Sequence, residues 1–309
     1  MEETKKASII ETIGKDFGAA PFTTKEACDR VSEENGVNRE SVRARIYEAI
    51  DRGILKRISK GLYKSRDCLL IEGDGRDLSF LANETIDAIV TDHPYDIGAS
   101  NKGGNRSFAD YECFRYEQKD FDEKARVLKK GSFLVEFIPE ENADNYEYLY
   151  QLKEMAKKAG FVYYSKVAWQ KKGFVSNCGR KSKDSEDVLI FTKGKARCLR
   201  PDAKKNLADP SIQHYMSGAN GMLPTTFSYS KPENMIHQAE KPVELLESIL
   251  DYVTLPNEIV IDQFAGSGVL GEAALKKGRK SILIEISHEC VEKIVSRLGM
   301  KPCLTNYAV

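Results

Sequence analysis

The chain has 309 residues, of which 41% are hydrophobic and 30% charged, and its acidic and basic residues balance to a formal net charge of zero. This composition is typical of a globular protein of about two domains, and with no net charge any contact with nucleic acid must come from local basic patches. No apolar run reaches the ~20 residues that span a bilayer, and the charged N-terminus lacks a signal-peptide core.

Residues 1–66 are predicted to form a separate module. Apolar residues at helical spacing indicate a helix over 8–17, and a capping Thr23 begins a second helix over 23–35. Val42, Ile46 and Ile50 mark a third helix that Gly53 ends, and the alternation in "ILKRISKGLYKS" predicts a hairpin with its turn at 59–61. Three helices followed by a hairpin resemble a winged helix-turn-helix.

The third helix and the hairpin carry a local excess of positive charge, which suits contacts with DNA phosphates. A solvated helix face, or a winged helix used for protein contacts, is the alternative. The residues that we predict to bind DNA here are Arg39, Arg43, Arg45, Lys56, Arg57 and Lys60.

From Asp67 onward, strands and helices alternate. Two short apolar runs, 68–74 and 86–92, end in acids, and units of helix, turn and strand follow them. This alternation predicts an α/β fold with a doubly wound, mostly parallel, Rossmann-like sheet. In such sheets ligands bind beyond the carboxyl ends of the strands, where the acids lie.

Two stretches break this alternation, 96–112 and 196–236, and long irregular segments are usually functional or disordered. The first is polar and rich in Gly and Asn. The second combines prolines, aromatic residues and positive charge. Its Tyr215, Phe227 and Tyr229 either pack in a small subcore or touch DNA, whereas Trp169 is expected in the core. Its basic residues that we predict to bind DNA are Arg197, Arg200, Lys204 and Lys205.

The stretch "IVIDQFAGSG" (259–268) places a strand directly before a glycine loop, and a helix follows. Gly266 and Gly268 allow a sharp turn and close approach of the backbone to a ligand, and the amides of a helix N-terminus bind anions. Glu285 ends the next strand, where an acid accepts hydrogen bonds from ribose hydroxyls. The pattern lacks a third glycine and a Walker lysine, so it favours a nucleoside-type cofactor over dinucleotides and nucleoside triphosphates.

Asp92-His93-Pro94-Tyr95 resembles the Asp-Pro-Pro-Tyr motif of S-adenosylmethionine-dependent DNA amino-methyltransferases. The catalytic motif precedes the cofactor loop, an order similar to that of the permuted beta group. The resemblance covers residues 67–309 and implies a methyltransferase domain with a target-recognition insertion at 196–236; residues 1–66 lie outside it. The other segments that carry it are "LLIEGD" (69–74), "HQAEKPVELLESIL" (237–250), "QFAGSG" (263–268) and "GRKSILIEIS" (278–287).

The resemblance implies S-adenosyl-L-methionine as the cofactor. Asp74 would accept from the adenine amine of the cofactor, or else is a turn acid at a strand end. Lys241 would neutralise the cofactor's carboxylate or touch DNA, or else is a surface lysine. The implied cofactor-binding residues are Asp74, Lys241, Asp262, Phe264, Ala265, Gly266, Ser267, Gly268 and Glu285.

The chemistry expected of the catalytic motif is methylation of an exocyclic amine. The N6 amine of adenine is a poor nucleophile because its lone pair is delocalised, and an enzyme helps by accepting both amine hydrogens. Asp92 and the backbone carbonyl of His93 would accept them, while Tyr95 stacks on a base extruded from the duplex. Asp in the first position favours adenine N6 within the family, and cytosine N4 is the alternative.

Two residues depart from the family pattern: His93 and Gln263 each stand where proline is usual. Pro94 still restricts His93 to extended conformations, so the direction of the carbonyl can survive. We expect His93 to be a tolerated substitute, with contact of its ring to DNA or general-base chemistry as the alternatives. A DNA-binding regulator with an inactive methyltransferase domain is therefore the rival to a site-specific enzyme.

The remaining expectations concern surroundings. The seven scattered cysteines form no CxxC pair and the four histidines lack metal-ligand spacing, so we expect reduced thiols, no metal and a cytoplasmic location. The partner is double-stranded DNA, and dimers are common in the resembled family. A restriction-modification setting is expected from the resemblance.

Overall fold

The computed structural model describes residues 22–51, 55–60, 62–65, 67–95, 113–172, 184–207, 209, 211–232 and 240–298. The helix predicted over 8–17 lies outside these ranges. Within them, no helix combines the length and apolarity needed to cross a membrane. The cysteines in these ranges, Cys28, Cys68, Cys113, Cys198 and Cys290, all carry free thiols.

The N-terminal unit has its own small core, built by two helices and a three-stranded sheet. Thr23 caps the first helix as predicted: its hydroxyl accepts from the Glu26 amide, and the Glu26 carboxylate accepts from the Thr23 amide at 2.7 Å. The two helices and the hairpin are thus confirmed, while the winged-helix assignment remains a prediction. The elements are β1 (Phe22–Thr23), α2 (Thr24–Asn35), α3 (Arg39–Asp51), β2 (Leu55–Ser59) and β3 (Leu62–Ser65), with the antiparallel strand order β1-β3-β2.

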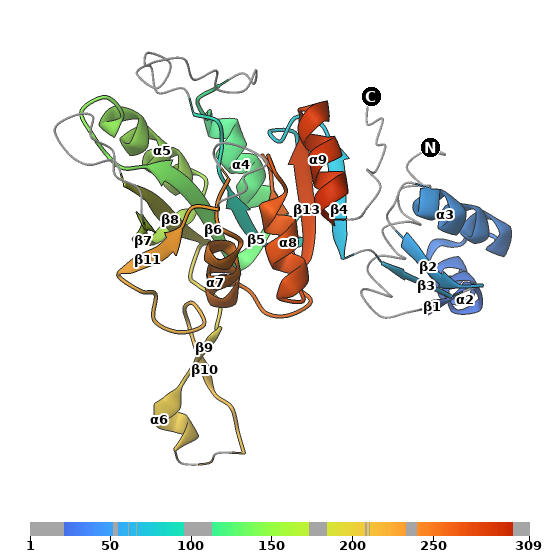
Figure 1. Cartoon of the computed structure of the whole chain (residues 1–309). Helices are drawn as coiled ribbons and strands as arrows, with labels where there is room; N and C mark the ends of the chain where they lie inside the picture. Colours follow the sequence, from blue (N-terminus) through green and yellow to red (C-terminus); the bar gives the residue numbers. More distant parts are fainter. Residues whose placement is uncertain are drawn as a thin grey trace.

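The main unit is built on an eight-stranded sheet of order β11-β7-β8-β6-β5-β12-β13-β4 (Figure 1). Neighbouring strands run parallel except β8, which is antiparallel to both its neighbours. The mostly parallel sheet predicted from the alternation is confirmed. The strands are β4 (Cys68–Glu72), β5 (Ile86–Thr91), β6 (Leu128–Pro139), β7 (Phe161–Lys172), β8 (Ser185–Lys193), β11 (Thr226–Ser230), β12 (Ile259–Asp262) and β13 (Lys280–Glu285).

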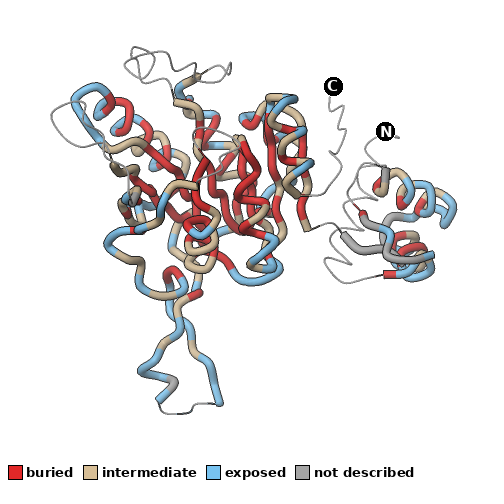
Figure 2. Tube along the Cα trace, in the orientation of Figure 1, coloured by how far each residue is buried: buried red, intermediate tan, exposed pale blue. Residues whose placement is uncertain are grey.

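Helices cover both faces of this sheet. Successive strand residues point to opposite sides, and since the strands carry buried apolar residues on both sides, each face offers such side chains to a layer of helices. α4 (Gln118–Val127) and α5 (Tyr146–Lys158) pack on the face that includes Ile89 and Leu189. α7 (Val243–Val253), α8 (Val269–Lys276) and α9 (His288–Leu298) pack on the face that includes Val90 and Val188. The sheet between them is buried over most of its length (Figure 2).

The carboxyl ends of β4, β5, β12 and β13 meet at one edge of the sheet, since these strands are parallel neighbours. Asp74, Asp92, Asp262 and Glu285 lie at or just beyond these ends. The fold therefore gathers in space the acids that the sequence distributes over most of the chain.

A thin arm leaves the sheet between β8 and β11 (Figure 1). β9 (Arg200–Pro201) and β10 (Tyr215–Met216) pair antiparallel, and the short α6 (Ala203–Asn206) lies beyond them. The prediction of one irregular segment over 196–236 is wrong in part, because β11 pairs with β7 as an edge strand of the main sheet. Phe227 is buried there in the main core. The buried Trp169 indole donates to the backbone carbonyl of Tyr229 at 3.1 Å, so Phe227 and Trp169 both have packing roles.

β6 begins directly after α4, without the glycine turn that the sequence suggested. Gly131 lies inside the strand, at a shift of register between β5 and β6, with a positive φ of 77°. A Cβ there would lie 2.8 Å from the Arg197 amide and 2.9 Å from the Lys195 carbonyl oxygen. The backbone amide of Arg197 in turn donates to the Gly131 carbonyl at 2.9 Å. The first residues of the arm therefore pack directly against the backbone of β6 at this glycine.

Gly131→Ala should destabilise the protein more than Gly194→Ala. Both glycines have a positive φ, which costs roughly 1–2 kcal/mol for an alanine, but a Cβ on Gly194 meets no atom within 4 Å. The clash at Gly131 should add ~1–3 kcal/mol to the loss of unfolding free energy. Urea unfolding of both variants measures the difference, and equal losses would contradict the close packing of the arm.

Candidate active site

The predicted catalytic motif follows β5 and is fixed at its far end. Phe114 donates its amide to the Pro94 carbonyl at 3.0 Å, and Tyr95 forms an isolated bridge with Phe114. Pro94 has no amide hydrogen to donate, so only its carbonyl takes part in this pairing. The tetrapeptide therefore has defined backbone partners after the strand has ended.

Asp92 makes a short ion pair with Lys241, whose ammonium lies 2.6 Å from Asp92 Oδ2. The same ammonium lies 2.8 Å from Glu186 Oε2, and Lys171 pairs with Glu186 Oε1 at 2.5 Å. These four side chains come from four separate elements: the end of β5, the start of α7, β8 and β7. Lys241 is only 7% exposed, so the alternative of a surface lysine is wrong.

Burial and neighbouring charges act against each other in this network. Burial raises the pKa of Asp92, and the Lys241 ammonium limits that rise. Burial alone would also raise the pKa of Glu186, but Lys241 and Lys171 outweigh it and lower the pKa to about 2. The two carboxylates raise the pKa of Lys241 although burial opposes this. Glu186 and Lys241 are therefore charged at neutral pH, and the Lys241 ammonium favours the ionised form of Asp92.

Tyr95 donates its hydroxyl to Asp92 Oδ1 at 3.2 Å. Burial and the Asp92 carboxylate hold its pKa well above the ordinary tyrosine value, so the hydroxyl stays protonated. The two oxygens of Asp92 thus have unlike partners, an ammonium at a short distance and a hydroxyl at a longer one.

The ring of His93 points into the protein interior, and its side chain is fully buried. Its Nε2 lies 2.7 Å from the Tyr148 hydroxyl, and its ring stacks on Tyr116 with centroids 4.0 Å apart. The alternative that this ring contacts DNA is wrong for this structure. The expectation of a substitute held by packing agrees with its surroundings.

A second buried ion network lies beside His93. Lys124 pairs with Glu136, and both side chains are wholly buried. Burial alone would raise the pKa of Glu136, but the Lys124 ammonium outweighs it and holds the pKa below the usual range. His93 Nδ1 lies 3.7 Å from Glu136 Oε2, too far for a hydrogen bond, and has no hydrogen-bond partner among the described residues. The carboxylate favours the tautomer with hydrogen on Nδ1, leaving Nε2 to accept from Tyr148.

The glycine loop after β12 is organised around Glu285. Its carboxylate accepts from the Gly266 amide at 2.7 Å and from the Ser287 amide at 2.8 Å. Burial raises the pKa of Glu285, and it also raises the pKa of Asp262, which reaches about 7. A Cβ on Gly266 would meet no atom within 4 Å, so the backbone of this loop is open to a close approach.

The Gln263 side chain is buried and joins the glycine loop to a neighbouring turn. Its side-chain nitrogen donates to the Gly75 carbonyl at 2.6 Å, inside the protein. A Cβ on Gly75 would lie 1.7 Å from the Gln263 carbonyl oxygen and 2.9 Å from the Phe264 ring, so the two loops touch. This contact brings the turn that carries Asp74 against Phe264. The Asp74 carboxylate is bonded to Arg76 at 2.8 Å, as a turn acid would be.

The other predicted cofactor residues lie in the same loop. The Asp262 carboxylate accepts from the Thr91 hydroxyl at 3.0 Å and from the Phe264 amide at 3.1 Å. Ala265 and Ser267 are buried, and Gly268 has a φ of 74° and precedes α8. A buried carboxylate, open glycine backbone, an aromatic ring and a helix N-terminus suit a nucleoside carrying an amino-acid moiety.

The predicted DNA-binding residues fall into two groups. In the N-terminal unit, Arg39 pairs with Asp29, and Arg45 pairs with Glu48. Three further residues, Arg43, Arg57 and Lys60, are exposed, and the Lys56 side chain is not among those that the structure describes. On the arm, Lys204 and Lys205 are exposed on α6, and Arg200 lies on β9.

Arg197 has a structural role instead of the predicted DNA contact. It pairs with Glu258 at 2.5 Å and donates to the Val253 carbonyl at 2.9 Å. Its guanidinium therefore fixes the arm to the end of α7.

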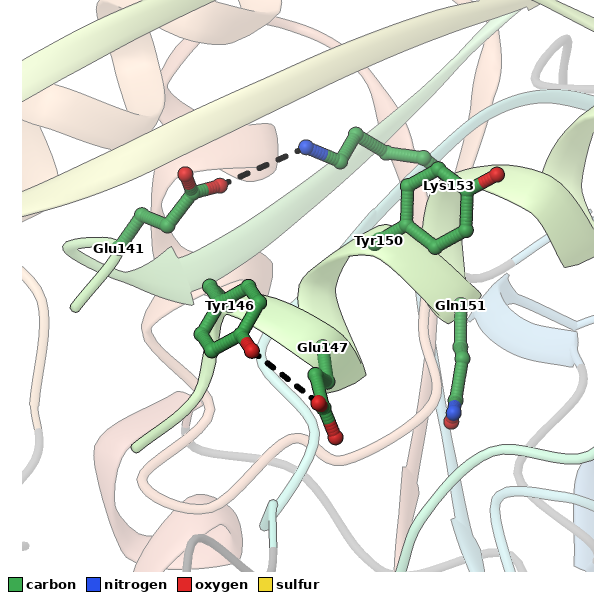
Figure 3. Close-up of a pocket in the computed structure, with 6 residues that line it drawn as sticks. All are labelled: Glu141, Tyr146, Glu147, Tyr150, Gln151 and Lys153. Atoms are coloured by element: carbon green, nitrogen blue, oxygen red, sulfur yellow. Dashed lines mark hydrogen bonds and ion pairs between the residues drawn. The ribbon is translucent and has the colours of Figure 1, made fainter. Parts of the chain in front are cut away.

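A surface hollow of about 420 Å³ lies elsewhere, along α5 (Figure 3). Two exposed tyrosines, Tyr146 and Tyr150, line it together with charged residues that pair with one another, such as Lys153 with Glu141 at 3.5 Å. None of the predicted site residues lines this hollow, so it is separate from the candidate active site.

Sequence reasoning missed the two networks behind the motif. Glu136 had a visible signal, because an acid inside the apolar run "FLVEFI" must find a buried partner. Glu186 and Lys171 had none, since each reads as an ordinary charge at the end of a strand. The described residues contain no cluster of three or more side chains suited to hold a metal ion.

Comparisons with known proteins give one consistent result. A family model described as DNA methylase, of the N6/N4 type, matches residues 86–296. DNA adenine methyltransferase YhdJ of Escherichia coli strain K12 is 26% identical over 251 residues, covering 75% of this chain and 82% of its own.

Two solved structures share the fold. That of M1.HpyAVI in complex with SAM aligns with a TM-score of 0.54 and 21% identity, over 75% of this chain and all of that one. That of the cytosine-N4-specific PvuII DNA methyltransferase aligns with a TM-score of 0.55 and 20% identity, over 79% and 89%.

We expect the His93 imidazole to remain neutral where free histidine protonates, near pH ~6.5. Burial lowers its pKa, so the ring gains a proton only at more acidic pH. Imidazole resonances followed by NMR against pH measure this, with His93→Gln assigning the signal and free imidazole in the same tube as the control. A His93 signal that titrates together with free imidazole would contradict the buried geometry.

Proposed function

The chain belongs to the N6/N4 family of DNA methylases, and on that premise we propose that it transfers a methyl group from S-adenosyl-L-methionine to the N6 amine of adenine in double-stranded DNA. The observation that carries the proposal is the Asp92 carboxylate paired with Lys241 at the end of β5, beside the glycine loop of β12. The Lys241 ammonium favours the ionised form, which accepts hydrogen bonds through both oxygens.

The proposed cofactor site is formed by the glycine loop and its neighbours. S-adenosyl-L-methionine supplies, when bound, a methyl group on a sulfonium that is its own leaving group. We assign Glu285 to the ribose hydroxyls and the Phe264 ring to the adenine. Each oxygen of a carboxylate accepts more than one hydrogen bond, so the amides on Glu285 leave room for hydroxyls. The solved relative M1.HpyAVI, which contains SAM, supports this choice of cofactor.

Asp92 and the His93 carbonyl are the proposed acceptors of the two amine hydrogens. Two acceptors favour a tetrahedral nitrogen whose lone pair is available for the methyl group, and the methylated amine then loses one proton. Their contribution is preorganised electrostatics, because the Asp92 carboxylate and the buried His93 ring are fixed by their partners before a base arrives.

Tyr95 is the proposed stacking surface for the target base. A base inside a duplex cannot reach Asp92, so it must be extruded, at a cost of a few kcal/mol. The Tyr95 ring packs edge to face with the buried His93 ring, with centroids 4.8 Å apart, and this contact restricts the orientation of its plane. We propose that this ring stabilises the extruded base by stacking.

Adenine is the favoured target for two reasons. The motif begins with Asp, which is more typical of adenine-N6 enzymes in this family, and YhdJ is a DNA adenine methyltransferase. The similarity in fold to the PvuII enzyme keeps cytosine N4 as the second candidate.

The two departures from the family motif do not argue for an inactive domain. The His93 ring is bonded to Tyr148 and the Gln263 amide to Gly75, so each replaced proline has a packed substitute. We therefore favour an active enzyme over a regulator that only binds DNA.

We propose that two basic surfaces grip the duplex. One is the N-terminal unit, with Arg43, Arg57 and Lys60 exposed near its helix and hairpin. The other is the arm, which extends away from the sheet and exposes Lys204 and Lys205 (Figure 1). Such an arm has the reach to enter a groove of the duplex.

Incubation with labelled cofactor and DNA of mixed sequence should yield N6-methyladenine on nucleoside analysis. Asp92→Ala should remove transfer while cofactor binding, measured by calorimetry, stays close to wild type, because Asp92 contacts Lys241 and Tyr95 rather than the glycine loop. N4-methylcytosine alone would reverse the choice of base. Retained transfer in the variant would overturn the role of Asp92.

The double variant Lys204→Ala/Lys205→Ala should weaken DNA binding on all sequences alike. Two lost phosphate contacts should reduce the slope of log affinity against log salt by about 2. Lys157→Ala/Lys158→Ala, at the exposed end of α5, is the matched control. An unchanged slope in the arm variant would remove the arm from the DNA interface.

A further inference from the structure

Lys241 is a buried lysine that two carboxylates share. We infer that Lys241 is a positioning residue for the proposed amine acceptor: its ammonium keeps Asp92 ionised and holds Oδ2, which leaves Oδ1 for the target amine. The inference deepens the proposed function and rests on it. Nothing in the residue pattern predicted this pair, because the two residues lie 149 positions apart in the sequence.

The Lys241 ammonium is held in place from several sides. Glu240, the preceding residue, pairs with Arg297 at 2.5 Å, and Arg297 donates to the Ser267 carbonyl at 2.9 Å. The rings of Phe137 and Trp169 lie 5.2 and 5.8 Å from the ammonium. The segment before α7 is therefore tied to the glycine loop, and the lysine head is enclosed by aromatic faces.

The two oxygens of Asp92 differ in how easily they can exchange partners. Oδ2 faces an ammonium at 2.6 Å, a charge-assisted bond in a partly buried place. Oδ1 accepts from the Tyr95 hydroxyl at 3.2 Å, a longer and uncharged contact. An incoming amine replaces the weaker partner, so the geometry assigns it to Oδ1.

Glu186 opposes Lys241 because it competes for the same ammonium. It lies 2.8 Å from Lys241, and Lys171 holds it from the other side at 2.5 Å. Removing Lys241 and removing Glu186 must therefore move the protonation of Asp92 in opposite directions. The charged or titratable groups around Asp92 are Lys241 before α7, Glu186 on β8, Lys171 on β7, Glu136 on β6, Asp262 on β12, and His93 and Tyr95 of its own loop.

The experiment measures the pKa of Asp92 directly, from the carboxyl carbon resonance of protein labelled with ¹³C-aspartate. Asp92→Asn assigns the signal, and no turnover is needed. An opposite charge within a few ångströms lowers a carboxyl pKa by about 1–3 units, so Lys241→Met should raise the Asp92 pKa by about that much. Glu186→Gln should lower it, and Lys241→Arg should leave it near the wild-type value.

Lys171→Met is the matched control. Like Lys241→Met, it removes a lysine ammonium from Glu186, but this lysine has no ion pair with Asp92. Its shift should be much smaller than that of Lys241→Met. Equal shifts in the two variants, or a shift of the same sign in Glu186→Gln as in Lys241→Met, would overturn the inference.

The second measurement is the single-turnover rate against pH, with cofactor and DNA saturating. Transfer needs ionised Asp92, so activity falls as the pH drops through its pKa, and Lys241→Met should move this acid limb to higher pH. At a fixed pH below both limbs the rate should fall roughly 10- to 1000-fold. If Lys241→Met weakens only cofactor binding and leaves the limb in place, Lys241 serves the cofactor and the inference fails.

The outcomes separate the inference from the proposed function. A wild-type protein that methylates no DNA would refute the function, while the carbon resonance would still decide the role of Lys241. If Lys241→Met does not fold, the sign of the Glu186→Gln shift decides instead. An upward or absent shift in that variant would contradict the inference.

Discussion

The arrangement of this molecule depends on an ion pair that favours the charged form of one partly buried carboxylate at the end of a strand. Removing an aspartate from water favours its protonated form, and a protonated Asp92 could not accept both hydrogen bonds expected of it. Lys241 counters that tendency at 2.6 Å, and Glu186 and Lys171 balance the lysine in turn. The strands β7 and β8 and the start of α7 are thereby involved in the chemistry at the end of β5.

A similar logic governs the glycine loop and the interior behind the motif. Glu285 accepts the amides of its own loop, and Gln263 joins that loop to the turn that carries Asp74. Behind Asp92, the His93 ring fills space beside the Lys124–Glu136 pair and bonds to Tyr148. Both residues that replace a family proline are held by buried hydrogen bonds, so the backbone that proline would stiffen is fixed by side chains instead.

Much of this could be predicted from the sequence, because the functional segments are contiguous. The apolar strand before Asp92, the glycines after β12 and the acid after β13 each form a local pattern, and parallel strands bring their ends together. The orientation of His93 could not be predicted, since the sequence does not say to which side of an extended residue the space lies. The Lys241–Asp92–Glu186 network joins elements far apart in the chain, so only the fold reveals it. β11 was missed because its short, proline-flanked sequence becomes a strand only through pairing with β7.

The most direct test of the whole account is an experimental structure of the protein with a duplex that contains its target site and a non-transferring analogue of the cofactor. The account predicts an extruded adenine stacked on Tyr95, with its amine within hydrogen-bond distance of Asp92 Oδ1 and the His93 carbonyl, and with Lys241 still on Oδ2. A target base bound elsewhere, or an Asp92 that does not face the amine, would contradict it.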